Sequence, residues 1–377
     1  MILPLWAARD LGLTAGEWSL LRSTRVIGTF GMMVLLTIIT PWLTPTSLAT
    51  GALLLTALAI AAMSIFGETG LFVWVMLLGG GVSASFVGIN ALTQLVSRRR
   101  QGSANAAVRG AITSGKLLAP IAATSAASLL GGYLAVLASA SVLLVLAAGS
   151  LAFFPIGRDT HPARRGSEAT GRASTRIAKR VADAFVSPLR NRPLQKFIHL
   201  SEVPRELILI APGFAAIRLV TDMGQPDAIV GVTVTSASIG TLLASFWYAR
   251  HLDSASLRKT KFLISVSASL AIVAAGLAAN WWMLAGAIGL MCWFANFNGA
   301  PMSMWISRVT GALPISSSLT HHKLVSSGYG VVVALAFAAL EPHIGLASVL
   351  ITLGVAGVVT SFPILLLEEP DPSSTHL

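Results

Sequence analysis

The stretch "GRDTHPARRGSEATGRASTRIAKRVADAFVSPLRNRPLQK", from Gly157 to Lys196, separates two long apolar parts of the chain. It holds ten Lys/Arg against three Asp/Glu, a net charge of +7 out of the chain's +11. No recognisable nucleic-acid-binding module accompanies this charge, whereas an excess of Lys and Arg is usual in the cytoplasmic loops of membrane proteins. We therefore interpret the stretch as a basic cytoplasmic linker, with no nucleic-acid partner.

The parts on either side of the linker are rich in apolar residues. The whole chain is 54% hydrophobic and 11% charged, with a mean hydropathy of +0.77, which is more apolar surface than a water-soluble core can hold. A helix needs about 20 mostly apolar residues to cross a bilayer. We expect eleven such helices, at 26–43, 48–66, 71–96, 104–130, 133–155, 197–220, 229–248, 262–279, 281–307, 317–340 and 345–367.

This pattern predicts an all-α polytopic membrane protein in four parts. They are an N-terminal transmembrane half at 1–156, the linker at 157–196, a C-terminal transmembrane half at 197–367 and a tail at 368–377. Loops on the linker's side carry the other Lys and Arg clusters, and the alternate loops carry none. The linker and the C-terminus are therefore expected to be cytoplasmic, in a plasma (inner) membrane.

The first residues, "MILPLWAARD", are too short for a signal peptide or a span. The alternation of loops puts Met1 outside. Either the chain begins there, or a first helix is missing; "LPLW" reads like the last turn of a span, which favours the missing helix.

The segment "SRRRQGSANAAVRGAITSGKLLAP" begins at Ser97 and places charge inside an expected span. Pro120 predicts a bend that neighbouring helices must accommodate, and Gly115 allows close packing. A lysine at mid-membrane costs at least about 2.5–3.5 kcal/mol unless it meets water or a partner. Lys116 is therefore expected to face a central cavity, the alternative being a lysine that extends to the helix end.

With a first helix added, the chain has two sets of six helices around a basic loop and resembles the major facilitator superfamily over essentially its whole length. The segment from Ser97 is similar to that family's connection from helix 4 into helix 5, with Arg109 as its inward arginine. Gly115 and Pro120 match the glycine and proline motif of the family's exporters, although Ala119 and Ala123 stand where glycines are usual. The resemblance implies alternating access by a monomer, and the motif favours export.

Two features depart from the family. The loop "TPWLTPTS" carries none of the charges of the family's gating motif between helices 2 and 3, and helix 1, which lines the cavity, is the helix expected to be missing.

Polar residues in or next to the expected spans are candidates for binding substrate or coupling an ion. Arg22 and Arg25 share a helix face, either toward the cavity or in the headgroup layer. Glu202, Arg205 and Glu206 share another, as a proton site or as a salt-bridge cluster at the cytoplasmic end. Further candidates, which could instead join helices, are Asn90, Gln94 and Asn296.

A short internal sequence repeat adds one residue to the candidates. "VRGAITSG", ending at Gly115, and "THHKLVSSG", ending at Gly328, place Arg109 and His322 at the same distance before their glycines. His322 is therefore a candidate for proton coupling, or a histidine near the cytoplasmic surface.

Small residues recur at four-residue spacing at Gly80, Ala84 and Gly88, which predicts close helix packing. Cys292 is the chain's one cysteine, and no motif of metalloproteases, P-loop enzymes or serine hydrolases occurs. We expect neither an enzyme nor a metal or other cofactor.

Two functions fit these patterns. The first is secondary active transport of small polar or anionic organic molecules, coupled to protons and directed toward export. The alternative is a non-transporting relative with a sensing or assembly role. The expected partners are a small-molecule substrate, protons and the lipid bilayer.

Overall fold

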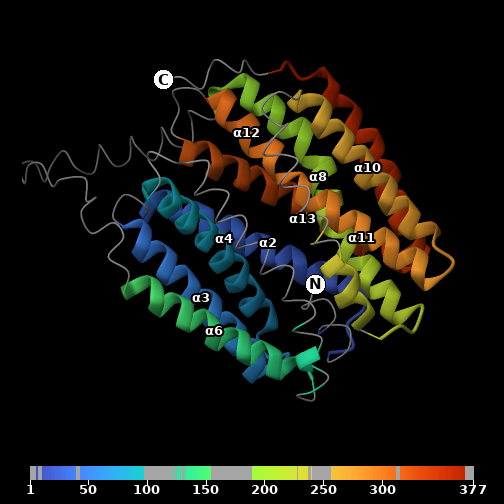
Figure 1. Ribbon diagram of the computed structural model, residues 1–377, viewed down its shortest axis with the longest axis horizontal. Coiled ribbons are helices and arrows are strands. Elements are labelled where there is room, and N and C mark those ends of the chain that lie inside the picture. The colour runs from blue at the N-terminus through green and yellow to red at the C-terminus, as the bar shows by residue number, and fades with distance from the viewer. Residues whose placement is uncertain are drawn as a thin grey trace, which may run out of the picture.

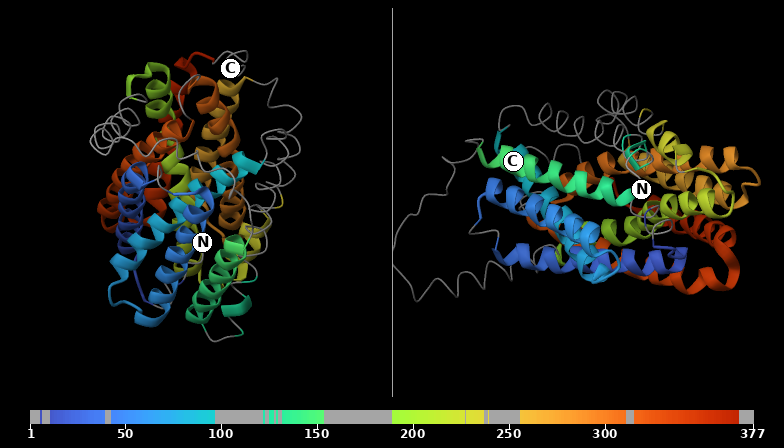
Figure 2. Two further views of the ribbon diagram at one scale, coloured as in Figure 1. Left: turned by 90° about the vertical axis from the view of Figure 1, so that its left-hand side faces the viewer. Right: turned by 90° about the horizontal axis from the view of Figure 1, so that it is seen from below.

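The computed structural model describes residues 11–39, 43–96, 132–153, 189–226, 228–236, 256–310 and 315–369, together with Trp6, Ile239 and five residues between 122 and 129. These residues form helices and connecting turns, without a strand among them. Figure 1 shows the helices in two groups that lie side by side, and Figure 2 shows the same elongated bundle from two further directions.

In the described part of the chain, the N-terminal group contains four long helices. They are α2 (Ala15–Ile39), α3 (Pro45–Phe66), α4 (Leu71–Val96) and α6 (Tyr133–Phe153). Helix α3 packs between α4 and α6, and α2 packs against α4. The bounds of α4 are those predicted for the span at 71–96.

Helix α2 begins eleven residues before the predicted span at 26–43. Its start is a capping box, in which the backbone N–H of Glu17 donates to Thr14 Oγ1 at 3.2 Å and the N–H of Thr14 donates to Glu17 Oε2 at 2.8 Å. The apolar pattern did not include these first eleven residues of α2 because Glu17, Arg22 and Arg25 lower their mean hydropathy. Both arginines therefore lie inside the helix.

The C-terminal group comprises α8 (Arg192–Thr221), α10 (Leu257–Leu277), α11 (Trp281–Phe297), α12 (Gly299–Thr310), α13 (Ile315–Ser361) and the 3₁₀ helix η3 (Phe362–Leu366). Helix α8 starts within the stretch predicted as linker. Asn191 caps it by accepting a hydrogen bond from Leu194 N, with a proline in the first turn.

One predicted span is broken into two helices, and two other predicted spans are joined in one helix. The span predicted at 281–307 is interrupted at Asn298, between α11 and α12. Helix α13 and η3 together cover the two spans predicted at 317–340 and 345–367, which meet within α13 at a bend where Gly345 has a φ of 75°. That left-handed conformation is open to glycine at little cost. The spans predicted at 104–130 and 229–248 lie largely outside the described residues.

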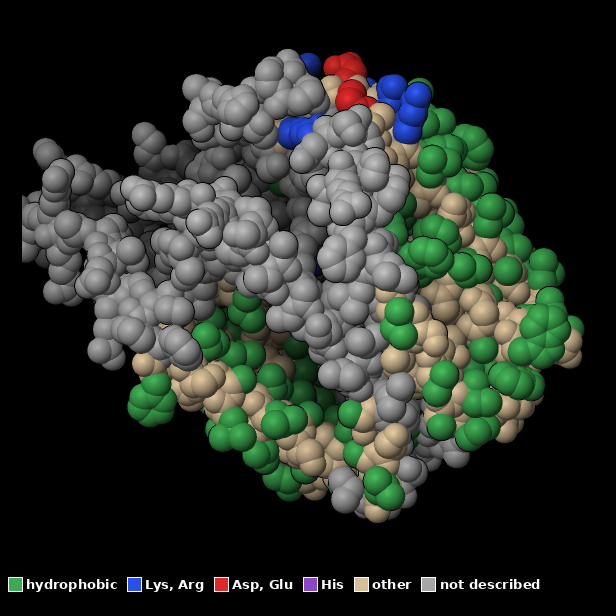
Figure 3. All heavy atoms as spheres, in the orientation of Figure 1, with side chains coloured by type: hydrophobic (Ala, Val, Ile, Leu, Met, Phe, Trp, Pro, Cys, Tyr) green, Lys and Arg blue, Asp and Glu red, His purple; other side chains and the backbone are tan. Residues whose placement is uncertain are grey.

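Among the described residues, six helical segments are long and apolar enough to cross a membrane. Large apolar side chains lie on the outside, including Phe153 at 89% exposure and Ile65 at 73%. Figure 3 shows these apolar side chains spread over the visible flank, with the visible charged ones gathered at one end. This is the surface of a multi-pass membrane protein.

The two groups meet where α2 packs along α13. Ser19 Oγ donates to the backbone oxygen of Ala334 at 2.5 Å in a buried contact. The rings of Phe214 and Phe337 stack nearby, within a core to which Leu21 of α2 also belongs.

Helix α10 is held at both ends by other elements. At its start, Glu369 accepts hydrogen bonds from Leu257 N at 2.5 Å and Ser256 Oγ at 2.8 Å. At its end, the guanidinium of Arg218 on α8 donates to the backbone oxygens of Ala275, Gly276 and Ala278. An anion at the N-terminus and a cation at the C-terminus both complement the helix dipole.

Replacing Arg218 with methionine should lower the free energy of unfolding by about 1.5–3 kcal/mol, because the last carbonyls of α10 lose a charged donor. Unfolding of the purified protein in mixed detergent and SDS micelles measures the change. Arg190→Met, at an exposed position before α8, is the control and should leave stability unchanged. Equal stabilities of the two variants would contradict the role given to Arg218.

Candidate functional site

The site begins with one face of α8. Glu202, Arg205 and Glu206 are three and four residues apart and therefore lie on adjacent turns of the same side. Pro204 and Pro212 lie within the helix. A proline leaves the carbonyl four residues earlier without its helical partner and bends the axis.

Arg205 joins the two glutamates. Its Nη1 donates to Glu202 Oε2 at 2.5 Å and to Glu206 Oε1 at 3.2 Å. The same nitrogen donates to Ser326 Oγ of α13 at 2.8 Å. The carboxylates are buried, with Glu202 at 0% exposure, so their charges depend on these partners rather than on water.

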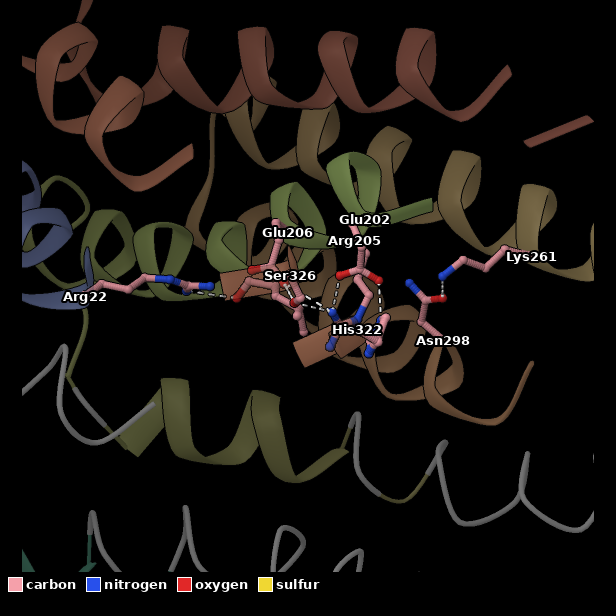
Figure 4. A network of polar contacts seen from close by, with 9 residues as sticks. Arg22, Glu202, Arg205, Glu206, Lys261, Asn298, His322 and Ser326 are labelled. Atoms are coloured by element: carbon pink, nitrogen blue, oxygen red, sulfur yellow. Dashed lines mark hydrogen bonds and ion pairs between the residues drawn. The ribbon is translucent and has the colours of Figure 1, made fainter. Parts of the chain in front are cut away.

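Helix α13 completes the network from the opposite side. His322 Nε2 lies 2.6 Å from Glu202 Oε1, and Ser326 Oγ donates to Glu206 Oε1 at 2.7 Å. His322 and Ser326 are four residues apart, so one face of α13 meets one face of α8. Figure 4 shows both side chains pointing to the glutamates. Each glutamate therefore has a partner on α13 as well as Arg205.

A second buried cation lies beside this network. Lys261 of α10 is 0% exposed, and its ammonium donates to Asn298 Oδ1 at the junction of α11 and α12. The Asn298 Nδ2 is buried without a hydrogen-bond partner among the described residues. Lys261 and Glu202 interact electrostatically. Figure 4 shows Asn298 on the side of Lys261 that faces Glu202.

Helix α2 contributes a cation from the other group of helices. Arg22 Nη1 donates to the backbone oxygen of Leu209 at 3.1 Å. Leu209 lies three residues before Pro212 on α8. The guanidinium thus bridges the two groups through a neutral partner.

Lys323 provides another link between the groups. Its ammonium lies 5.5 Å from the centroid of the Phe86 ring of α4, a distance suited to a cation–π contact. Lys323 is also repelled by Arg205 and Arg25 and attracted by Glu206 and Glu202.

The predicted site residues are distributed unevenly. The structure brings together Glu202, Arg205, Glu206 and His322, with Arg22 close by. Asn90, Gln94 and Asn296 lie on α4 and α11, and their side chains are not among the described ones. Four predicted residues lie outside the described part of the chain: Arg109, Gly115, Lys116 and Pro120.

The small residues of α4 lie at helix contacts. A Cβ added at Gly80 would lie 3.3 Å from the Gly28 oxygen of α2, and one added at Gly88 would lie 2.7 Å from Ala49 N of α3. Ala84 is buried in a cluster shared by α2, α3 and α4. These positions leave little room for larger side chains.

Sequence reasoning missed four residues of this region. They are Lys261, Asn298, Lys323 and Ser326. Ser326 lies one turn after His322, so helical spacing could have found it once the histidine was chosen. Lys261 was predicted to lie in a cytoplasmic loop, and the structure places it in the first turns of α10. Among the described residues, no cluster of three or more His, Cys, Asp or Glu could hold a metal ion.

A scan against models of known protein families finds no match, and no curated protein matches either. Among solved structures, the chain is similar to a crystal structure of a mutant of the nucleoside transporter NupG. The TM-score is 0.70 at 16% sequence identity, over 98% of this chain and 94% of that one. The likeness shows that this chain shares the fold of that protein, and it confirms the all-α polytopic fold that the sequence predicted.

Proposed function

We propose that this protein is a secondary active transporter that moves small polar or anionic organic molecules by alternating access. The observation that carries the proposal is the buried network of Glu202, Arg205, Glu206 and His322 between α8 and α13, beside α2 of the other half. Buried charges in a membrane protein are costly and usually serve a substrate or ion path. The likeness in fold to a transporter supports this use of the network.

Alternating access requires contacts between the halves that can break. The hydrogen bonds from Ser19 to Ala334 and from Arg22 to Leu209 join α2 to the C-terminal group through uncharged acceptors. Their loss costs less than the loss of an ion pair between buried charges. The network of α8 and α13 lies within one half and can stay intact while the halves rock.

Protons are the coupling ion in this proposal. His322 shares a hydrogen bond with Glu202, and imidazole is the side chain whose protonation changes most readily near neutral pH. A proton held at His322 Nε2 strengthens its contact with Glu202 and weakens that carboxylate's hold on Arg205. Because Arg205 also donates hydrogen bonds to Glu206 and Ser326, the weaker contact with Glu202 alters these two contacts as well.

The direction of transport and the orientation in the membrane are proposed from the sequence. Export is favoured by the small residues around Pro120, and the basic linker supports a cytoplasmic position for it in a plasma (inner) membrane. The working unit is a monomer. Nucleosides are the first polar compounds to test, since the similar structure is of a nucleoside transporter. A likeness over nearly the whole chain does not favour the non-transporting alternative.

Proton movement in proteoliposomes tests the proposal. A panel of nucleosides and organic anions is added to vesicles that carry an internal pH dye. Wild type should move protons with at least one compound, and Glu202→Gln and His322→Gln should abolish that flux. Glu368→Gln, at an exposed position after η3, should retain it. Absence of flux and of substrate exchange with every compound, from folded protein, would refute transport.

A further inference from the structure

The charges inside the protein do not balance. Glu202 and Glu206 are matched in number by Arg205 and Lys261, which interact with them. Three further cations remain among the described residues of the interior, all on α2 and α13: Arg22, Arg25 and Lys323. The described interior therefore carries a surplus of positive charge.

The direct contacts of Arg22 and Lys323 are with neutral groups, although both cations are also attracted by Glu206, which Arg205 and Ser326 already bind. Arg22 donates to a backbone oxygen, and Lys323 faces the Phe86 ring. Arg25 makes no ion pair with a described residue. All three side chains are partly buried, where neutral partners compensate a charge poorly.

The two predicted spans that lie largely outside the described residues offer no acid to neutralise them. The sequence has no Asp or Glu between Glu17 and Glu68, between Glu68 and Asp159, between Asp227 and Asp253, or between Asp253 and Glu341. These intervals include the spans predicted at 104–130 and 229–248, so no carboxylate can come from them.

Arg22 and Arg25 lie one turn apart on α2, and Lys323 lies near the start of α13. Their helices, α2 and α13, belong to different halves and pack against each other. A ligand that binds all three would therefore join the two halves.

We infer that the substrate is a small organic dianion, such as a phosphate monoester or a dicarboxylate, whose anionic group binds Arg22, Arg25 and Lys323 between the halves. This inference rests on the proposed transport function and narrows its substrate class. Two negative charges neutralise most of the surplus, and oxyanions accept the charged hydrogen bonds that guanidinium groups donate. Binding draws Arg22 away from Leu209 O and replaces a neutral partner with a charged one.

Matched pairs of compounds test the inference on the purified full-length protein. Ribose is compared with ribose 5-phosphate, and monomethyl succinate with succinate, by the rise in melting temperature that each produces. The dianions should stabilise the protein at concentrations where ribose has no effect. Arg25→Gln and Lys323→Gln should each weaken this binding about tenfold or more. Lys259→Gln, which removes an exposed cation at the start of α10, is the matched control and should bind as wild type does.

Each outcome has a distinct meaning. Stabilisation by ribose equal to that by ribose 5-phosphate would overturn the inference, as would unchanged binding in both glutamine variants. Transport of neutral compounds only would overturn it while leaving the proposed function in place. Binding of dianions with no transport in proteoliposomes would support the site and refute the proposed function. The comparison of compounds on wild type decides the matter even where a variant fails to fold.

Discussion

Arg205→Met should lower the free energy of unfolding by about 3–5 kcal/mol, because the change leaves two buried carboxylates without their shared cation. Of the hydrogen bonds described here, Glu202 would keep the one with His322, and Glu206 would keep the one from Ser326. We also expect transport to be lost, since the variant protein must protonate one glutamate or admit water to the site.

A combined variant provides the control for this prediction. Arg205→Met together with Glu202→Gln and Glu206→Gln removes both orphaned charges, so it should be more stable than Arg205→Met alone. Unfolding in mixed micelles, analysed as a mutant cycle, gives the coupling free energy between Arg205 and the two glutamates. A loss below about 1 kcal/mol in Arg205→Met, the range of exposed ion pairs, would mean that water already solvates the network.

Gly28→Leu should prevent α2 from packing on α4, at a cost of about 3 kcal/mol or more. A Cβ at Gly28 would overlap the backbone of Met76, and one at Gly79 would overlap the backbone of Arg25. The neighbouring atoms are main-chain atoms, so no side chain can move aside to relieve the clash. We expect little monodisperse protein after purification.

Gly31 is the matched control on the same helix. A Cβ there meets nothing within 4 Å, so Gly31→Leu should give protein of normal yield and elution volume in size-exclusion chromatography. Comparable yields from the two leucine variants would contradict the close contact of α2 and α4.

The apolar helices were predictable because crossing a bilayer imposes length and composition together. Leu71 and Val96 bound both the predicted span and α4. The pattern failed where charge enters a helix: it excluded the first turns of α2, which contain Arg22, and the first turns of α10, which contain Lys261. A charged residue inside a packed bundle has partners far away in the sequence, and hydropathy of a local window cannot include them.

The candidate site was predictable in part for the same reason. The spacing of Glu202, Arg205 and Glu206 put them on one face, and this is a local property of a helix. Their pairing with His322 depends on how α8 and α13 pack, and the two residues of that contact are 120 positions apart. The single lysine Lys323 carried no pattern at all; its setting follows from the ring of Phe86 on another helix.

The cap on α10 ties the assembly of this protein to the end of its synthesis. Glu369, which accepts the hydrogen bond from Leu257 N, follows that residue by 112 positions. At about 5–20 residues per second, the ribosome supplies Glu369 about 6–22 s after Leu257. During that interval, the first backbone N–H groups of α10 do not yet have the carboxylate of Glu369 as their hydrogen-bond acceptor. The cap of α10 by Glu369 can therefore form only after the last span has been translated. The packing of the C-terminal half is completed late in biosynthesis.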